Sequence, residues 1–358
     1  MMAFRSYVIF AIISLLLPAA PAVSEDIILQ SDGRFATRDL QEKMPLLSGG
    51  KVIINSASSL SGRLYIFADT ISQASFDYKK VFKTNQPDEA AGYDKVIDVT
   101  LEKTPDGMRI LLQAPNPAPW EGSDNSGQIE GDLRLPYNCQ LEFDAPYFDL
   151  IITGPFKRVE NKSSFGRLEV QKVSGKVRLT TSNQDILARE ISGDITLITS
   201  NADIRIDGLT ADEKPARIRN ENGNVMLNAA RGGIDIESSY GKIKGDDLYL
   251  TGDGSHISGS YGPIRLTLAG MEKSSLVVKN TNSIVEMRLP DNISGNFRLS
   301  VDVNSEIDAY GLNMKPILVD YNQMEFRCGQ GESKIVVGVE SNGNILIRGV
   351  PAKADENR

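Results

Sequence analysis

The sequence predicts an all-β protein, a single-stranded β-helix or β-solenoid with coils of about 18–22 residues, plus a β-rich N-terminal capping segment. Three observations support this prediction. Ten turn signals recur at nearly constant intervals, and short stretches of alternating apolar and polar residues flank them. Two neighbouring segments, SGKVRLTTSNQDILAREI (174–191) and SGDITLITSNADIRIDGL (192–209), also match over 18 positions.

The turn signals are asparagines or aromatic residues, separated by 18, 18, 18, 21, 18, 21, 21, 22 and 38 positions. The last interval is close to two periods. Asn tolerates the left-handed backbone of tight turns, and Gly follows each aromatic member after the first, so we expect Asn or Gly to supply a positive φ. Stacked Asn amides and stacked rings can also interact along the column. The ten residues are Tyr147, Phe165, Asn183, Asn201, Asn222, Tyr240, Tyr261, Asn282, Asn304 and Asn342.

Within one coil the alternation predicts which side chains point inward. Val177, Leu179 and Thr181 alternate with polar residues on a first strand, and Ile186 and Ala188 do so on a second. Two strands and two turns in 18 residues would enclose a thin apolar interior.

The N-terminal residues 1–24, MMAFRSYVIFAIISLLLPAAPAVS, predict a secretory signal peptide. Arg5 precedes the apolar run Val8–Leu17, which is shorter than the roughly 20 residues of a membrane anchor. The C-terminal residues 351–358 form a polar tail. We therefore expect an exported protein, periplasmic or at the cell surface, with no integral membrane segment after signal removal.

Residues 25–131 are expected to form the N-terminal β-rich segment, and residues 132–350 the solenoid repeat domain. A short helix is expected at Arg38–Met44, and a loop at 116–131 that contains the single tryptophan, Trp120. The turn sequence at 103–107 predicts a hairpin between the strands on either side. The expected strands are Lys51–Asn55, Arg63–Ala68, Ser75–Lys83, Lys95–Glu102 and Met108–Gln113.

Charge and cysteine content restrict the function further. The chain has 39 basic and 47 acidic residues, a net charge of −8, which becomes −9 (38 − 47) without the signal peptide and argues against nucleic acid as a partner. Cys139 and Cys328 would lie roughly 40 Å apart if coils stack at about 4.8 Å. A disulfide needs Cα atoms within about 7 Å, so we expect two free thiols.

The sequence offers no catalytic, cofactor or metal residues that we would assign. The single histidine, His256, is expected on a solvent-facing strand position, without a triad around it. Aspartates near turns could bind calcium but lack the tandem repeat of calcium-binding β-rolls. These are Asp246, Asp247 and Asp253.

Polysaccharide lyases and hydrolases are also built on β-helices and use carboxylates on one face. Asp185 and Asp203 lie one coil apart and would be the candidate acids here. A carbohydrate-active enzyme is therefore the alternative to a binding protein.

The repeat resembles the bacterial putative-adhesin domain family, a domain of unknown function, over roughly residues 130–350. This resemblance implies a secreted or surface β-solenoid, and it brings no catalytic residues. The matching segments are Gly131–Pro136, Leu141–Asp144, Leu150–Gly154, Gly166–Val170, Ser174–Leu179, Ser192–Leu197 and Ser341–Ile347.

These observations predict an exported, non-catalytic adhesin or cell-envelope scaffold that binds an envelope protein or a glycan. Tyr240, Tyr261 and Trp120 are the candidate binding surface. The turn column also has a purely structural interpretation, because its residues are those that let each coil close. Envelope-stress signalling through a membrane partner stays open as a third role.

Overall fold

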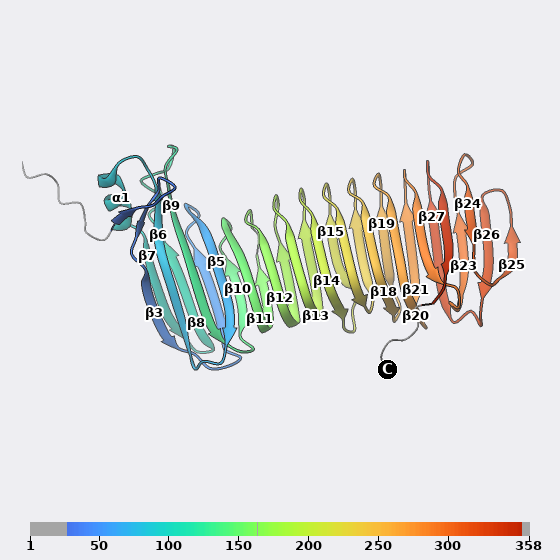
Figure 1. Ribbon diagram of the computed structural model, residues 1–358, viewed down its shortest axis with the longest axis horizontal. Helices are drawn as coiled ribbons and strands as arrows, with labels where there is room; N and C mark the ends of the chain where they lie inside the picture. Colours follow the sequence, from blue (N-terminus) through green and yellow to red (C-terminus); the bar gives the residue numbers. More distant parts are fainter. Residues whose placement is uncertain (1–26, 163, 353–358) are drawn as a thin grey trace, which may run out of the picture.

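The computed structural model describes residues 27–162 and 164–352. That part of the chain contains 28 strands in one continuous sheet and one short helix, so the all-β prediction is confirmed. The strands lie side by side along the long axis, with the N-terminal strands at one end and β25 at the other (Figure 1). The predicted signal peptide and residues 353–358 of the predicted tail lie outside the described residues.

Antiparallel pairs occur at both ends of the sheet, and the N-terminal group surrounds β6, which pairs with β2, β3 and β9. The expected hairpin at 103–107 is present as β7 and β8. The N-terminal strands are β1 (Ile27–Leu29), β2 (Phe35–Thr37), β3 (Leu40–Pro45), β4 (Lys51–Ser56), β5 (Leu60–Asp69), β6 (Gln73–Lys83), β7 (Asp98–Thr104), β8 (Gly107–Gln113) and β9 (Ser126–Pro136).

The helix expected at Arg38–Met44 is wrong, because this segment is strand β3, paired antiparallel with β6. Its side chains are mostly exposed and form no apolar stripe, so a helix there would have no face to bury. The one helix that the structure describes is α1 (Pro87–Asp94), which the sequence analysis missed. Pro87 begins it and acidic residues fill its first turn, which are ordinary start signals, but only Ala90 and Tyr93 are buried.

The N-terminal strands continue into the repeat without a break in the sheet. Strand β4 pairs in parallel with β10, and β5 pairs in parallel with β11. Strand β9 runs through the expected boundary between residues 131 and 132. The division into two domains stays a prediction.

Parallel pairing one repeat apart organises the middle of the sheet. Ile186 pairs with Ile204, 18 positions later, and Ile204 pairs with Val225, 21 positions later. The strands are β10 (Gln140–Asp144), β11 (Phe148–Asn161), β12 (Leu168–Thr180), β13 (Ile186–Thr199), β14 (Ile204–Ala211), β15 (Ala216–Asn220), β16 (Val225–Arg231), β17 (Ile234–Ser238), β18 (Ile243–Thr251), β19 (Ser255–Gly259), β20 (Ile264–Glu272), β21 (Ser275–Asn280) and β22 (Val285–Pro290).

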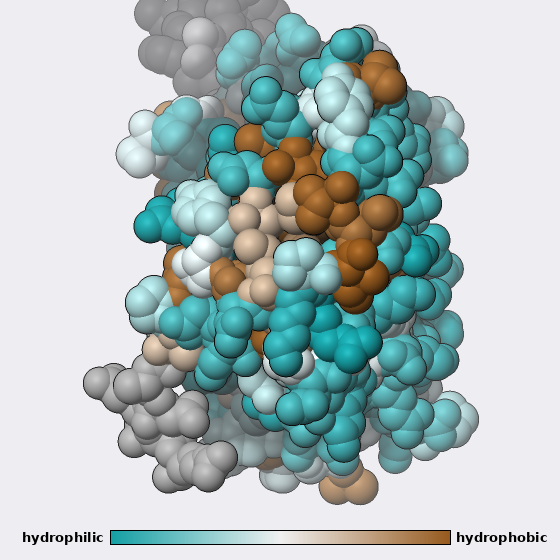
Figure 2. Space-filling model, turned by 90° about the vertical axis from the view of Figure 1, so that its right-hand side faces the viewer, coloured by the Kyte–Doolittle hydropathy of each residue, from teal (hydrophilic) through white to brown (hydrophobic). Residues whose placement is uncertain are grey.

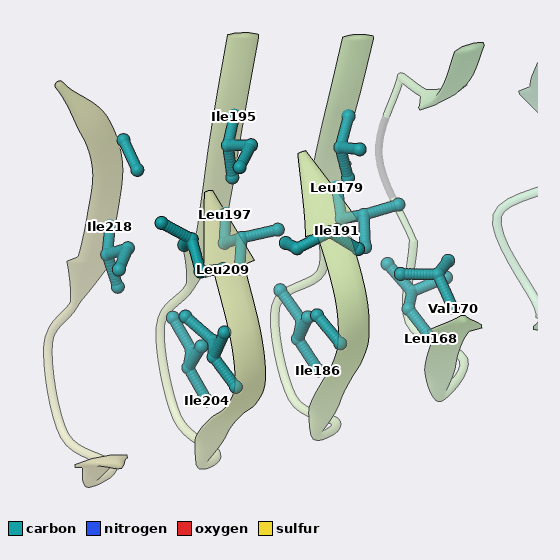
Figure 3. Close-up of a cluster of buried hydrophobic side chains, with 14 of the residues drawn as sticks. Leu168, Val170, Leu179, Ile186, Ile191, Ile195, Leu197, Ile204, Leu209 and Ile218 are labelled. Carbon is teal, nitrogen blue, oxygen red and sulfur yellow. The ribbon is translucent and has the colours of Figure 1, made fainter. Parts of the chain in front are cut away.

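The core is a narrow apolar layer enclosed by each repeat. The expected inward residues Val177, Leu179 and Ile186 are all at most 1% exposed. Side chains of successive repeats contact one another along this layer, as Figure 3 shows for the segment from Leu168 to Ile218. Burying one such side chain contributes roughly 1.5–3 kcal/mol, which makes the periodic Val, Ile and Leu positions the main source of stability.

The last repeats do not stack in chain order. Strand β27 lies between β21 and β23, and β28 lies between β22 and β24, so the C-terminal residues 333–350 separate two earlier repeats. Stacking of the predicted coils in chain order is therefore wrong at this end. The strands are β23 (Gly295–Ser300), β24 (Ile307–Tyr310), β25 (Met314–Val319), β26 (Gln323–Cys328), β27 (Ser333–Val339) and β28 (Ile345–Val350).

An antiparallel hairpin, β25–β26, covers β23 and ends the sheet. Apolar side chains gather in the middle of this end face and polar residues surround them (Figure 2). Ile317, Val319 and Tyr321 are among its exposed side chains, at 61%, 66% and 73%.

Candidate functional site

The ten turn signals form one column along an edge of the sheet, as their spacing predicts. Backbone bonds connect neighbouring members, for example from Asn201 N–H to Ser182 O and from Tyr261 N–H to Ser239 O. The order in space follows the sequence as far as Asn282. Asn342 comes next, ahead of Asn304, because β28 lies between β22 and β24.

The asparagines of this column are linked through their side chains. Asn201 donates from Nδ2 to Oδ1 of Asn183 at 2.8 Å, and Asn222 donates to Oδ1 of Asn201 at 2.8 Å. All three are exposed. The predicted amide ladder is confirmed for these residues, and it presents a row of amides to solvent.

The aromatic members stack in pairs. Tyr240 and Tyr261 have ring centroids 5.1 Å apart and planes within 4°, and they are 61% and 57% exposed. Tyr147 and Phe165 stack similarly, at 5.2 Å and 12°. The two exposed rings on adjacent repeats form a stacked aromatic pair beside the amides, which we call the Tyr240–Tyr261 platform.

The prediction that Asn or Gly supplies a positive φ in this column is wrong. None of its asparagines has a positive φ, and neither do Gly166, Gly241 and Gly262, which follow the aromatic members. Glycine is needed there for space, since a Cβ on Gly241 would overlap the carbonyl oxygen of Gly223 in the neighbouring repeat. The positive-φ residues of each repeat lie elsewhere, at positions such as Lys172 and Glu190.

Buried asparagines that the sequence analysis did not single out hold the turn backbone. Asn220 is 5% exposed; it donates to Ala202 O at 2.8 Å and accepts from Gly223 N–H at 2.9 Å. Asn280 donates in the same way to Gly262 O at 3.0 Å. A signal was present, because Asn220 stands two positions before the turn signal Asn222, as Asn280 does before Asn282.

Trp120 is not part of an exposed surface. Its side chain is 5% exposed, its Nε1 donates to Ser59 O at 3.0 Å, and its ring meets Tyr93 of α1 edge-on at 5.2 Å. The Pro- and Gly-rich composition of residues 116–131 gave no sign that the indole folds back onto the core. Cys139 and Cys328 are buried free cysteines, and burial raises the pKa of the Cys139 thiol to about 11.

The two candidate acids bind backbone groups. Asp185 Oδ1 accepts from Asp203 N–H at 3.0 Å, and Asp203 Oδ1 accepts from Asn224 N–H at 2.9 Å. Burial acts to raise the pKa of Asp203, but hydrogen bonds from Asn224 and Arg205 outweigh it and hold that pKa below its usual value. Asp203 therefore stays ionised, which is opposite to the raised pKa of a general acid.

Two of the other candidate side chains pair with residues of their own or a neighbouring strand. His256 is half-buried on β19, opposite Asp235, and Asp246 pairs with Lys244 at 2.6 Å. Within residues 27–162 and 164–352, no group of three or more His, Cys, Asp or Glu is placed to hold a metal ion.

A groove of about 670 Å³ lies over the strands that connect the N-terminal segment to the repeat. Pairing register sets a row of side chains across its floor, one from each of five neighbouring strands β8, β4, β10, β11 and β12. The row is Arg109, Ile53, Glu142, Glu160 and Arg178. The sequence analysis missed it because residues 53 and 109 lie outside the repeat.

Ion pairs organise the middle of this row. Arg158 contacts Glu142 at 3.1 Å and Glu160 at 2.7 Å, while Lys51 and Lys176 hold the outer sides of the two carboxylates at 2.8 and 2.7 Å. Partial burial acts to raise the pKa of Glu160, but the hydrogen bonds from Lys176 and Arg158 outweigh it and keep that pKa below its usual value. The charges alternate along the network, and the cations offset the repulsion between the two adjacent carboxylates.

The similarities to known proteins come from solved structures. No family model matches the chain, and no curated protein matches it. The chain is similar to solved structures from three bacteria, each described as a putative adhesin or putative cell adhesion protein. That is the class its sequence motifs resemble.

The three similarities cover most of each chain at low identity. The Clostridium sporogenes protein is 11% identical over 87% of this chain and 100% of its own, with a TM-score of 0.22. The Bacteroides fragilis protein is 8% identical over 87% of this chain and 97% of its own, with a TM-score of 0.29. The Parabacteroides distasonis protein is also 8% identical over 87% of this chain and 97% of its own, with a TM-score of 0.24. No helix among the described residues is long and apolar enough to cross a bilayer.

Proposed function

We propose that the protein is an exported, non-catalytic β-solenoid that acts as an adhesin or cell-envelope scaffold by binding a glycan through its turn column. The observation that carries this proposal is the exposed Tyr240–Tyr261 platform beside the amide row. Sugar rings offer an apolar C–H face and hydroxyl groups, and stacked rings beside amides match both.

The column supports binding through multiplicity. Each ring or amide contributes weakly, but the same kind of contact recurs on successive repeats at the spacing of neighbouring strands, about 4.8 Å. A polymer that contacts several of them at once gains affinity without a deep pocket. A scaffold with an envelope protein partner would use the same surface.

A glycan array with the full-length protein tests the proposal. The double variant Tyr240→Ala, Tyr261→Ala should weaken the affinity for any bound glycan at least about tenfold. Each stacking contact of this kind contributes about 0.5–1.5 kcal/mol in addition to the burial of apolar area. The matched control is Tyr137→Ala, which also removes an exposed tyrosine, at 38%, outside the column.

A reducing-sugar release assay on the same glycans separates binding from turnover. No release is expected from the wild-type protein. Release that disappears in Asp185→Asn or Asp203→Asn would replace this proposal with the enzyme alternative. An unchanged glycan affinity in the double tyrosine variant would exclude the turn column as the binding site.

A further inference from the structure

The groove at the start of the repeat concentrates positive charge in a protein whose net charge is −8. Five cationic side chains and three carboxylates line it, a formal surplus of 5 − 3 = +2. The cations come from three strands and their ends: Arg109, Arg158, Lys162, Lys176 and Arg178. A positive hollow on an acidic surface selects for an anionic group by its local field.

Two guanidinium groups of this groove lack a close ion pair. Arg178 is exposed and forms no ion pair within the part of the chain that the structure describes. Arg109 comes no closer than 4.0 Å to Glu102, and its Nε is buried without a hydrogen-bond partner among the described residues. A buried donor without a partner is costly, and an anion in the groove would supply one.

These two residues stand at opposite ends of the row. Four strand spacings separate them, or about 19 Å along the sheet. Glu142 and Glu160 between them are held by Lys51, Arg158 and Lys176. The weakly paired charge of Arg109 and the unpaired charge of Arg178 are therefore widely separated, which suits an extended ligand with several acidic groups better than a small anion.

The floor of the groove favours a ligand that needs no backbone pairing. Strands β4, β10 and β11 each pair with a strand on both sides, so their N–H and C=O groups are used within the sheet. An extended peptide would find no ladder partners for its own amides there. A sugar chain carries hydroxyls and acidic groups, which side chains can bind directly.

We propose that this groove binds an extended acidic polysaccharide, with its carboxylate or sulfate groups on Arg109 and Arg178 and its chain lying across strands β8 to β12. The planar guanidinium fork suits such groups because it can donate two parallel hydrogen bonds. This site goes beyond the turn-column proposal and lies several repeats away from Tyr240 and Tyr261. Either proposal can fail without the other.

Calorimetry with the full-length protein tests the site with polygalacturonate as the carboxylated probe and dextran sulfate as the sulfated probe. Binding to at least one is expected at about 0.01 M salt, weakening toward about 0.15 M as the charges are screened. Uncharged dextran should not bind the groove. Arg109→Gln with Arg178→Gln should weaken acidic binding at least about tenfold.

A matched control is Arg189→Gln. It removes one exposed cation from β13, at a position that does not line the groove. It should leave binding within about twofold, and circular dichroism should show that all variants are folded. The proposal is overturned if neither acidic polymer binds at low salt, or if the double variant binds like the wild type. Binding of polyglutamate or a single-stranded oligonucleotide but of neither polysaccharide would also overturn it.

Discussion

Glycines in the turn column set how closely neighbouring repeats approach at this edge. At Gly166, Gly223, Gly241 and Gly262, an added Cβ would overlap a carbonyl oxygen of the preceding repeat. None of these four has a positive φ, so the requirement comes from packing between repeats and not from local backbone conformation. The same close approach brings the exposed Asn and Tyr side chains within contact distance of one another.

Replacing one of these glycines should therefore be severe. Gly241→Ala is expected to cost about 1–3 kcal/mol or more, because the backbone of Gly223 cannot move aside without breaking the ladder. The matched control is Gly92→Ala in α1, where a Cβ meets nothing within 4 Å and helix propensity predicts a gain of roughly 0.5–1 kcal/mol. Thermal or urea unfolding of both variants measures the difference, and equal midpoints would contradict this account.

At the scale of elements, the ion-pair network across β4, β10, β11 and β12 couples stability to pH. The folded-state pKa of Glu160 lies below its usual value, because its hydrogen bonds to Lys176 and Arg158 outweigh the opposing effect of burial. For a depressed carboxyl pKa, the stabilisation is complete above the unfolded-state value of about 4.3. It is lost as pH falls through the lower folded value.

The expected result is a melting temperature that falls as pH is lowered from about 5 toward 3, with a shallower fall in Glu160→Gln than in the wild type. Glu221→Gln, which changes an exposed carboxyl at a turn, is the matched control and should keep the wild-type slope. Differential scanning calorimetry over this range supplies the measurement. A wild-type slope in Glu160→Gln would show that the network contributes nothing to acid sensitivity.

Periodicity explains which of these elements the sequence could predict. Alternation over one period identified Val177, Leu179 and Ile186 as core residues, because a strand buries every second side chain. The row from Arg109 to Arg178 could not be found this way, since its register passes through β4 and β8, which lie off the repeat. Strand β3 was missed because backbone pairing with β6, and no apolar pattern, decides it. Helix α1 was missed because only Ala90 and Tyr93 are buried, which leaves no amphipathic pattern to find.

On the scale of the whole molecule, chain order and stacking order separate at the C-terminal end. The interval of 38 residues between Asn304 and Asn342 fits the period equally well whichever repeat comes first. A period specifies that repeats stack, but it carries no information about which pair of repeats is adjacent. In the structure, β27 pairs with both β21 and β23, and β28 pairs with both β22 and β24.

This arrangement predicts a particular effect of truncation. Ending the chain at Cys328 removes β27 and β28, so residues 295–310 lose their parallel partners although they precede the cut. Hydrogen exchange should show protection lost from residues 307–310, and weakened at 275–290 and at 295–300, where β23 keeps its antiparallel partner β26. Residues 204–251, whose partner strands all lie between β13 and β20, serve as the internal control and should stay protected, because stability in repeat stacks depends mainly on nearest neighbours. The truncated protein should also associate, since β21, β22, β23 and β24 are each left with an unpaired edge. Full protection of residues 295–310 after truncation would mean that β23 and β24 can stack directly on β21 and β22. The insertion of β27 and β28 between them would then be unnecessary for the fold.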